Sequence, residues 1–140
     1  MYVKGVGMTK FGIQGGTSQE LVYEAAMEAL EDADIKLEDI DAVVSSIVES
    51  ESNGERQRGF SSVISSIFKK KIPIITASAV CGGGGAALWT ANKLDYDNIL
   101  IVGVERLLSN NSQNTTHEIM MAGERIYEQS EGLIFPAQNA

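Results

Sequence analysis

The fold class is decided by the stretch Pro73-Ile74-Ile75-Thr76-Ala77-Ser78-Ala79-Val80-Cys81-Gly82-Gly83-Gly84-Gly85-Ala86-Ala87-Leu88. Its first four residues, 73–76, predict a short strand, and a proline at the start of a strand removes no central ladder bond. Small apolar residues follow the four glycines at helical spacing: Ala86, Ala87, Leu88, Ala91 and Leu94. A strand that passes through a glycine-rich turn into a helix is typical of an α/β fold.

Regular structure is predicted on both sides of this stretch. Three further strands are expected at 2–8, 42–48 and 98–104, the last two being buried apolar runs. Thr17 and Glu20 form a capping box that opens a helix, and a second helix is predicted from Phe60 to Phe68. The apolar stripe of the first helix is Leu21, Val22, Ala25, Ala26, Ala29, Leu30 and Ala33. Four strands alternating with three helices predict a mostly parallel sheet with helices on both faces.

Composition narrows the functional classes. The chain has 140 residues, of which 44% are hydrophobic and 21% charged, as expected for one globular domain. A net charge of -8 argues against a dedicated nucleic-acid binder. No apolar run approaches the roughly 18–20 residues of a membrane span, and the N-terminus lacks the apolar stretch of a signal peptide. The single cysteine excludes an internal disulfide and a zinc site built from several cysteines, and it indicates a reducing, cytoplasmic compartment.

The pattern changes after Glu105. Residues 109–116 are all polar, a weak helix is predicted from His117 to Tyr127, and the apolar segment 132–137 follows. We therefore expect residues 1–108 to form the α/β core and residues 109–140 to form a separate loop region.

Cys81 is the candidate nucleophile. It lies between a strand and a helix start, where unpaired amides and a partial positive charge favour thiolate over thiol. Glycines beside it let a thioester substrate approach the backbone closely. A helix end supplies only about 0.3–1 kcal/mol, so a base or cation, usually a histidine, has to help.

Two other interpretations of the same turn stay open. Gly82, Gly84 and Ala87 fit the pattern G-x-G-x-x-A between a strand and a helix, and Glu105 lies about 20 residues further on, as in a dinucleotide-binding module. Alternatively, a lone cysteine among small residues is simply a small buried hydrophobe.

Several segments together resemble thiolases of the sterol-carrier-protein-2 type, including archaeal acetyl-CoA acetyltransferases. The opening stretch 5–12 resembles the start of that family, and 81–88 resembles its nucleophile turn. Residues 102–105 resemble the next strand, and the segments 122–124, 127–128 and 132–137 resemble the start of its active-site loops. The matches occur in the family's order and cover nearly the whole chain.

The resemblance implies the N-terminal half of a five-layer thiolase fold, without the second, C-terminal domain. It implies that Cys81 takes an acyl group from acyl-CoA, with the backbone at Gly82, Gly83 and Gly84 binding the substrate. An acetyl-CoA carbanion would then give a 3-oxoacyl-CoA, or CoA would cleave one. It further implies no metal and no cofactor beyond the coenzyme A thioester substrate, and a dimer, a tetramer or a partner chain.

This chain departs from the family in its catalytic groups. Family members take their catalytic histidines and a second cysteine from the C-terminal half, whereas this sequence has one cysteine and one histidine, His117, which matches no catalytic motif. We therefore expect little turnover by the isolated chain. The alternative is a non-catalytic subunit that docks with a separate C-terminal half, and we expect the apolar residues Leu133, Ile134 and Phe135 to be exposed for such docking.

Overall fold

The computed structural model describes residues 1–48, 55, 57–107 and 112–134. Its described part contains a sheet of three strands: β1 (Ala42–Ser46), β2 (Ile74–Thr76) and β3 (Ile99–Gly103). The order is β2-β1-β3, and both pairings are parallel. The predicted parallel α/β fold is confirmed.

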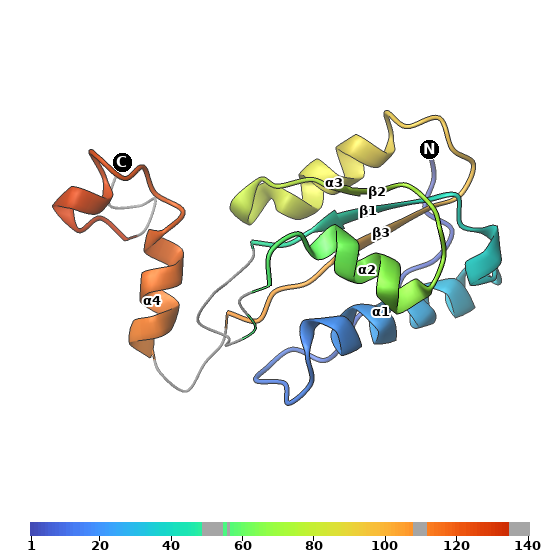
Figure 1. Ribbon diagram of the computed structural model, residues 1–140, viewed down its shortest axis with the longest axis horizontal. Helices are drawn as coiled ribbons and strands as arrows, with labels where there is room; N and C mark the ends of the chain where they lie inside the picture. The colour runs from blue at the N-terminus through green and yellow to red at the C-terminus, as the bar shows by residue number, and fades with distance from the viewer. Residues whose placement is uncertain (49–54, 56, 108–111, 135–140) are drawn as a thin grey trace.

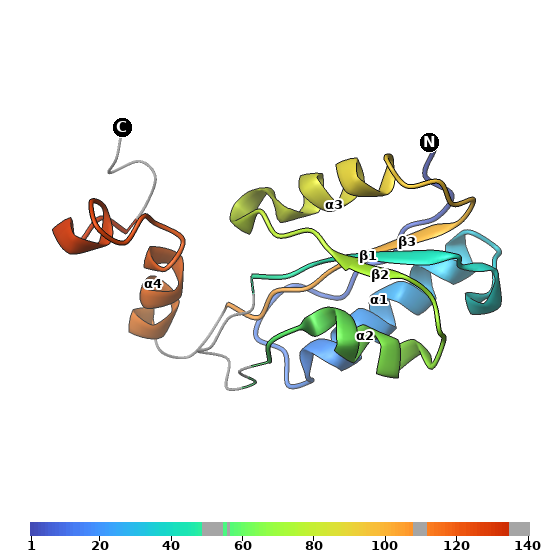
Figure 2. The same cartoon turned by 45° about the horizontal axis from the view of Figure 1, so that its top comes forward.

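Helices cover both faces of this sheet (Figure 1, Figure 2). On one face lie α1 (Ser18–Asp32) and α2 (Phe60–Phe68), and on the other lies α3 (Gly83–Ala91). A fourth helix, α4 (Ser112–Met120), lies away from these layers, beyond the end of the sheet at which the strands terminate. The predicted boundary at residue 108 falls within 108–111, which lie outside the described residues, so this division stays a prediction.

The strand β1 lies at the centre of the protein. Its residues Ala42, Val43 and Val44 have no exposed surface, because both neighbouring strands and both helix layers cover them. Such two-sided burial is typical of parallel strands, and it explains the unbroken apolar run in the sequence. The larger core cluster lies between the sheet and the first two helices, and it includes Val22, Leu30, Phe60, Ile64, Leu100 and Val102.

The local signals for α1 and α2 work as predicted. The Thr17 hydroxyl accepts from the Glu20 backbone N–H at 3.2 Å, and the Glu20 carboxylate accepts from the Thr17 N–H at 2.7 Å. The helix α2 ends at Phe68, and Lys69 follows in the left-handed conformation with φ 49°. The next lysine, Lys70, then donates to the backbone carbonyls of Leu37, Glu38 and Ile40 just before β1.

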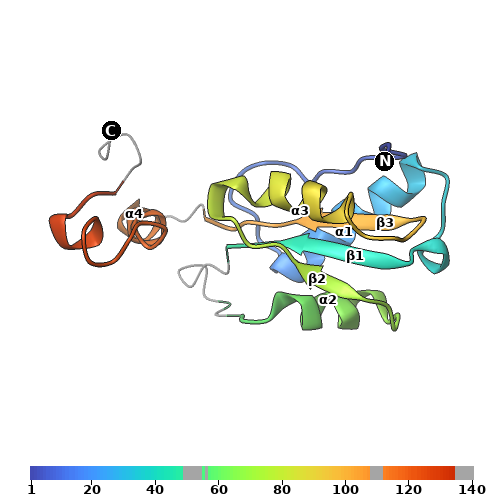
Figure 3. The ribbon, with the colours of Figure 1, turned by 90° about the horizontal axis from the view of Figure 1, so that it is seen from above.

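The N-terminal prediction is wrong. Residues 2–8 form no strand, and the described sheet has three strands instead of four. The reason is that the backbone N–H groups of Val6 and Met8 donate to the carboxylates of Asp32 and Glu28 on α1, at 2.9 and 3.0 Å, instead of to a neighbouring strand. The segment runs alongside the sheet without joining it (Figure 3).

Two helix boundaries also differ from the predictions. The helix after the glycines, α3, begins at Gly83 and not at Ala86, because glycines 83–85 already adopt helical geometry. The last helix, α4, covers Ser112–Met120 where the sequence favoured His117 to Tyr127. Leu133 and Ile134 are half-buried rather than exposed, and Phe135 lies outside the described residues.

The packing of α2 on the sheet gives a first prediction. Ile64 has no exposed surface, so Ile64→Ala removes buried apolar atoms and leaves a cavity. We expect the free energy of unfolding to fall by about 2–5 kcal/mol. Urea denaturation followed by circular dichroism measures it, with Ser65→Ala at an exposed position of the same helix as the control. A loss below about 1 kcal/mol would contradict this packing.

Candidate active site

The candidate site lies at the end of the sheet that is formed by the carboxyl ends of the parallel strands. Ser46 is the last residue of β1, and the chain leaves β2 through Ala77 and Ser78 toward Cys81. The Ala77 N–H donates to the Ser45 carbonyl at 2.8 Å, so the hydrogen bonding between the two strands continues for one residue beyond β2. In open α/β sheets, ligands bind outside the carboxyl ends of the strands.

Cys81 sits on a short 3-10 turn, Val80–Gly82, directly before α3. The turn is closed by a backbone hydrogen bond of 2.8 Å from the Gly82 N–H to the Ala79 carbonyl. Val80 adopts φ 45°, a left-handed conformation that a β-branched residue rarely takes. The thiol that follows is exposed to solvent. Such a strained residue beside an exposed cysteine is the kind of geometry that clusters at functional sites.

The glycines of the turn fall into two groups. Gly83 is buried, and a Cβ at this position would overlap the Ser46 hydroxyl oxygen, so it permits close packing of α3 on the end of β1. Gly82 and Gly84 are exposed, and nothing lies within 4 Å of where a Cβ on Gly84 would be. The backbone at the start of α3 is therefore bare on its outer side. Its role as a substrate-binding surface, with that of Gly83, stays a prediction.

No described residue is positioned as a base for Cys81. The predicted helper type, histidine, occurs as His117 on α4, where it is exposed. No hydrogen bond joins its imidazole to the thiol among the residues that the structure describes. The turn thus presents a thiol and a helix N-terminus without an identified general base.

Glu105 lies beyond β3 at the same sheet edge. Its carboxylate accepts a hydrogen bond of 2.5 Å from the Val48 backbone N–H. Partial desolvation raises the pKa of this carboxyl, the Val48 hydrogen bond opposes the rise, and the nearby charge of Glu118 adds to it. In the dinucleotide interpretation this carboxylate would bind ribose hydroxyls. Here one of its oxygens already accepts the hydrogen bond from the Val48 N–H.

A polar cluster that sequence reasoning missed joins three distant segments at this edge. Glu55 accepts hydrogen bonds from the backbone N–H and the hydroxyl of Ser18, at 2.7 and 2.5 Å, and pairs with the Arg106 guanidinium at 2.6 Å. Burial alone would raise the pKa of Glu55, but the Ser18 hydrogen bonds and the Arg106 charge outweigh it and lower that pKa. The carboxylate therefore caps the N-terminus of α1 and links it to the segment after β3. No local motif indicates this contact, since 37 residues separate Ser18 from Glu55.

Comparison with known proteins now adds to this geometry. The sequence matches the family "Thiolase, N-terminal domain" over residues 1–137. This chain belongs to the thiolase family. Sterol carrier protein 2 of Bos taurus is 30% identical over 115 residues, which are 77% of this chain and 20% of that protein. The family resemblance seen in the sequence is confirmed.

A solved structure supports the thiolase-type fold. The 3-oxoacyl-[acyl-carrier-protein] synthase III from Aquifex aeolicus VF5 superposes with a TM-score of 0.58 at 24% identity, over 67% of this chain and 31% of that one. This chain thus spans about a fifth of the length of the curated relative and about a third of the solved one. Among the helices in the described ranges, none is long and apolar enough to cross a membrane.

The contact between Gly83 and Ser46 yields a second prediction. Gly83→Ala should destabilise the protein, because its new methyl group would overlap the Ser46 hydroxyl. Ser46→Ala in the same chain should restore most of the loss, since it removes that oxygen. The control is Gly84→Ala, where space is open and an alanine inside a helix is expected to add about 0.5–1 kcal/mol. Thermal denaturation of the wild type and the three variants measures this, and equal effects at both glycines would contradict it.

The Glu55 cluster yields a third prediction. At neutral pH, Glu55→Gln should lower the free energy of unfolding by about 1 kcal/mol, because it removes charged hydrogen bonds at the N-terminus of α1. The pKa of Glu55 is lower in the folded state than in the unfolded state. Its contribution to stability is therefore fully present above the ordinary glutamate pKa of about 4.3, and it is lost as the pH falls through the lower pKa of the folded state. Denaturant titrations across the acid range should therefore show wild type and variant converging. Glu24→Gln, at an exposed position of α1, is the control, and a constant difference at every pH would refute the assignment.

Proposed function

We propose that this chain is the N-terminal, acyl-accepting part of a thiolase-type acyltransferase, with Cys81 as the nucleophile. The observation that carries the proposal is the exposed Cys81 thiol at the N-terminus of α3, in a chain that matches the thiolase N-terminal family over residues 1–137. Acetyl-CoA or another acyl-CoA is the substrate, and no metal or redox cofactor takes part.

The proposed first step forms a thioester on the enzyme. The Cys81 sulfur, as thiolate, attacks the carbonyl carbon of acyl-CoA, its own proton having passed to a base or to solvent. The tetrahedral oxyanion collapses, the bond to the CoA sulfur breaks, and CoA leaves as a thiolate that takes up a proton. The Gly82 and Gly83 N–H groups are bonded to the Ala79 and Val80 carbonyls, so the positive end of the α3 dipole would stabilise the oxyanion. The bare backbone at Gly82 and Gly84 lets the substrate approach this helix end.

The second step is a Claisen condensation. The carbanion of acetyl-CoA attacks the acyl-enzyme carbonyl, the bond to the Cys81 sulfur breaks, and a 3-oxoacyl-CoA is released; thiolysis by CoA is the reverse. Forming the carbanion needs a general base, and losing one forfeits typically about 10²–10⁴-fold in rate. We therefore propose that the chain alone catalyses poorly. A partner polypeptide or a homo-oligomer would supply the remaining groups, in the cytoplasm.

The fourth prediction tests the acyl transfer. Incubation with acetyl-CoA should leave one acetyl group on Cys81, detected by mass spectrometry of the intact protein and of its peptides. Cys81→Ser should remove the adduct, because the chain has no other cysteine. An adduct that survives this substitution, or no adduct after prolonged incubation, would overturn the role of Cys81. Cleavage of acetoacetyl-CoA by the purified chain at an ordinary enzyme rate would overturn the need for a partner.

A non-catalytic docking subunit is the second candidate. Within the described residues no strand pairs with the outer edge of β3, and this favours docking, because a sheet does not normally leave such an edge uncovered. The acetylation experiment distinguishes the docking subunit from the acyltransferase, because Cys81 of a docking subunit would stay unmodified while the chain still binds its partner. The family match does not support a dinucleotide-binding module. If NAD does not shift the melting temperature, this third function is excluded.

A further inference from the structure

Two consecutive serines interrupt the apolar run of the central strand β1. Ser45 and Ser46 follow three fully buried apolar residues, and Ser45 itself is only 1% exposed. Burying a hydroxyl group costs free energy unless the group finds a hydrogen-bond partner. The proposed acyl transfer uses neither serine, so their contacts have to explain why polar side chains lie here.

Ser45 contacts the chain directly before the turn that contains Cys81. Its hydroxyl oxygen lies 3.0 Å from the hydroxyl oxygen of Thr76 and 3.5 Å from the Ile75 carbonyl. Its own carbonyl accepts a hydrogen bond of 2.8 Å from the Ala77 N–H. One residue of β1 therefore contacts three successive residues at the end of β2.

Ser46 contacts the chain directly after the same turn. Gly83, the first residue of α3, is buried, and a Cβ there would lie 2.1 Å from the Ser46 Oγ. Val44 belongs to the core cluster beneath α3 and Val43 to the cluster on the opposite face. By alternation along the strand, Ser46 faces α3 and Ser45 faces the other layer. The end of β1 thus contacts both ends of the turn, one from each face of the sheet.

Between these two contacts the backbone is strained. Val80 adopts φ 45°, and its side chain is 43% exposed, so burial of that side chain does not impose the conformation. The two backbone hydrogen bonds that close the turn both stay within residues 79–83. Strained residues persist only where the surrounding structure over-determines them. The conformation of Val80 is therefore imposed through the two ends of the turn.

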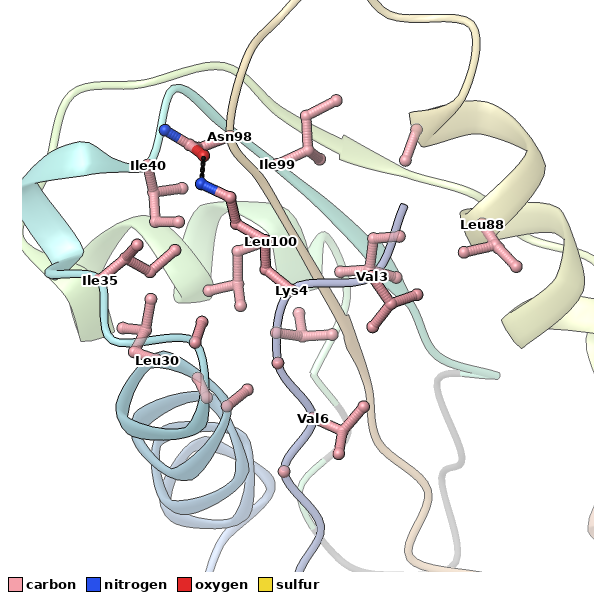
Figure 4. Close-up of a pocket in the computed structure, with 18 of the residues that line it drawn as sticks. Val3, Lys4, Val6, Leu30, Ile35, Ile40, Leu88, Asn98, Ile99 and Leu100 are labelled. Carbon is pink, nitrogen blue, oxygen red and sulfur yellow. Dashed lines mark hydrogen bonds between the residues drawn. The ribbon is translucent and has the colours of Figure 1, made fainter. Parts of the chain in front are cut away.

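The cavity beside β3 takes no part in this anchoring. It lies between β3 and residues 1–7 and has a volume of about 860 Å³ (Figure 4). Of the described residues, Gly84 and Leu88 of α3 line it, whereas no residue of β2 and none of 77–83 does. The groups that fix the turn are therefore those of β1 and β2.

We propose that Ser45, through the contact of its hydroxyl with that of Thr76, is a positioning residue for Cys81. The contact fixes the end of β2, keeps Val80 in its left-handed conformation and so places the thiol at the positive end of the α3 dipole. Without the contact, Val80 relaxes and the thiol moves away from the helix end. The inference deepens the proposed function and rests on it for its importance to catalysis.

The fifth prediction uses two alkylating reagents of different charge. Iodoacetate is an anion and iodoacetamide is neutral, and both alkylate the thiolate, so the ratio of their rates does not depend on the ionised fraction. Ser45→Ala and Thr76→Val should each lower this ratio about twofold to fivefold, the range that the interaction of a helix end with one charge spans. Both variants remove the same contact, so the double variant should be no lower. Intact mass spectrometry measures the rates, because Cys81 is the only cysteine.

Two control variants distinguish positioning from stability. Thr76→Ser keeps the hydroxyl group and should keep the wild-type ratio. Ile64→Val removes a buried methyl group under α2 and should lower the melting temperature without changing the ratio. A wild-type ratio in both Ser45→Ala and Thr76→Val, or an equal fall in Ile64→Val, would overturn the proposal.

The link through Val80 has its own test. Glycine adopts positive φ without strain, so a chain that carries Val80→Gly no longer needs the contact at Ser45 to hold this conformation. In that chain, Ser45→Ala should change the ratio by less than about half as much as it does in the wild type. An undiminished effect would overturn the proposal. Acetylation of Cys81 with an unchanged ratio would overturn only the positioning, and a lowered ratio without acetylation would overturn only the proposed function.

Discussion

The parallel pairing of β1 with both β2 and β3 is the constraint on which the rest of the structure depends. This pairing leaves Ala42, Val43 and Val44 of β1 without exposed surface, and Val43 and Val44 belong to the core clusters on opposite faces of the sheet. It also places the ends of three strands together, and with them Ser46, the turn at Cys81 and Glu105. A site at this edge is therefore a product of the topology, and its contacts come from residues far apart in the sequence.

The contact between Ser46 and Gly83 connects this constraint to the candidate chemistry. Because Gly83 has no side chain, the first turn of α3 can rest on the end of β1, directly after the turn that holds Cys81. The glycine run thus has two different physical roles. One glycine permits packing, and its neighbours leave the backbone exposed.

Periodicity and capping predicted most of the fold. The buried runs at 42–48 and 98–104, the capping box at Thr17 and the spacing from Phe60 to Phe68 all describe local preferences that the tertiary structure keeps. The segment 2–8 shows where such reasoning fails, because its pattern is that of a strand but a strand needs a neighbour, and its amides bond to side chains on α1 instead. The turn at Cys81 was visible in the sequence as a glycine cluster. The Glu55 cluster was not, since nothing in a sequence indicates that a loop carboxylate will meet a helix start and an arginine 51 residues away.

The two faces of the sheet differ in how much they bury, and this inequality has a consequence for motion. In the described part of the chain, the cluster beneath α1 and α2 contains large side chains such as Phe60, Ile64 and Phe68, whereas the buried members of the cluster beneath α3 are Val44, Ala87 and Ala91. Cooperative units with few buried apolar contacts open at lower free energy than the whole protein. We therefore expect the layer formed by α3, which begins directly after the turn that holds Cys81, to open at lower free energy than the layer on the opposite face.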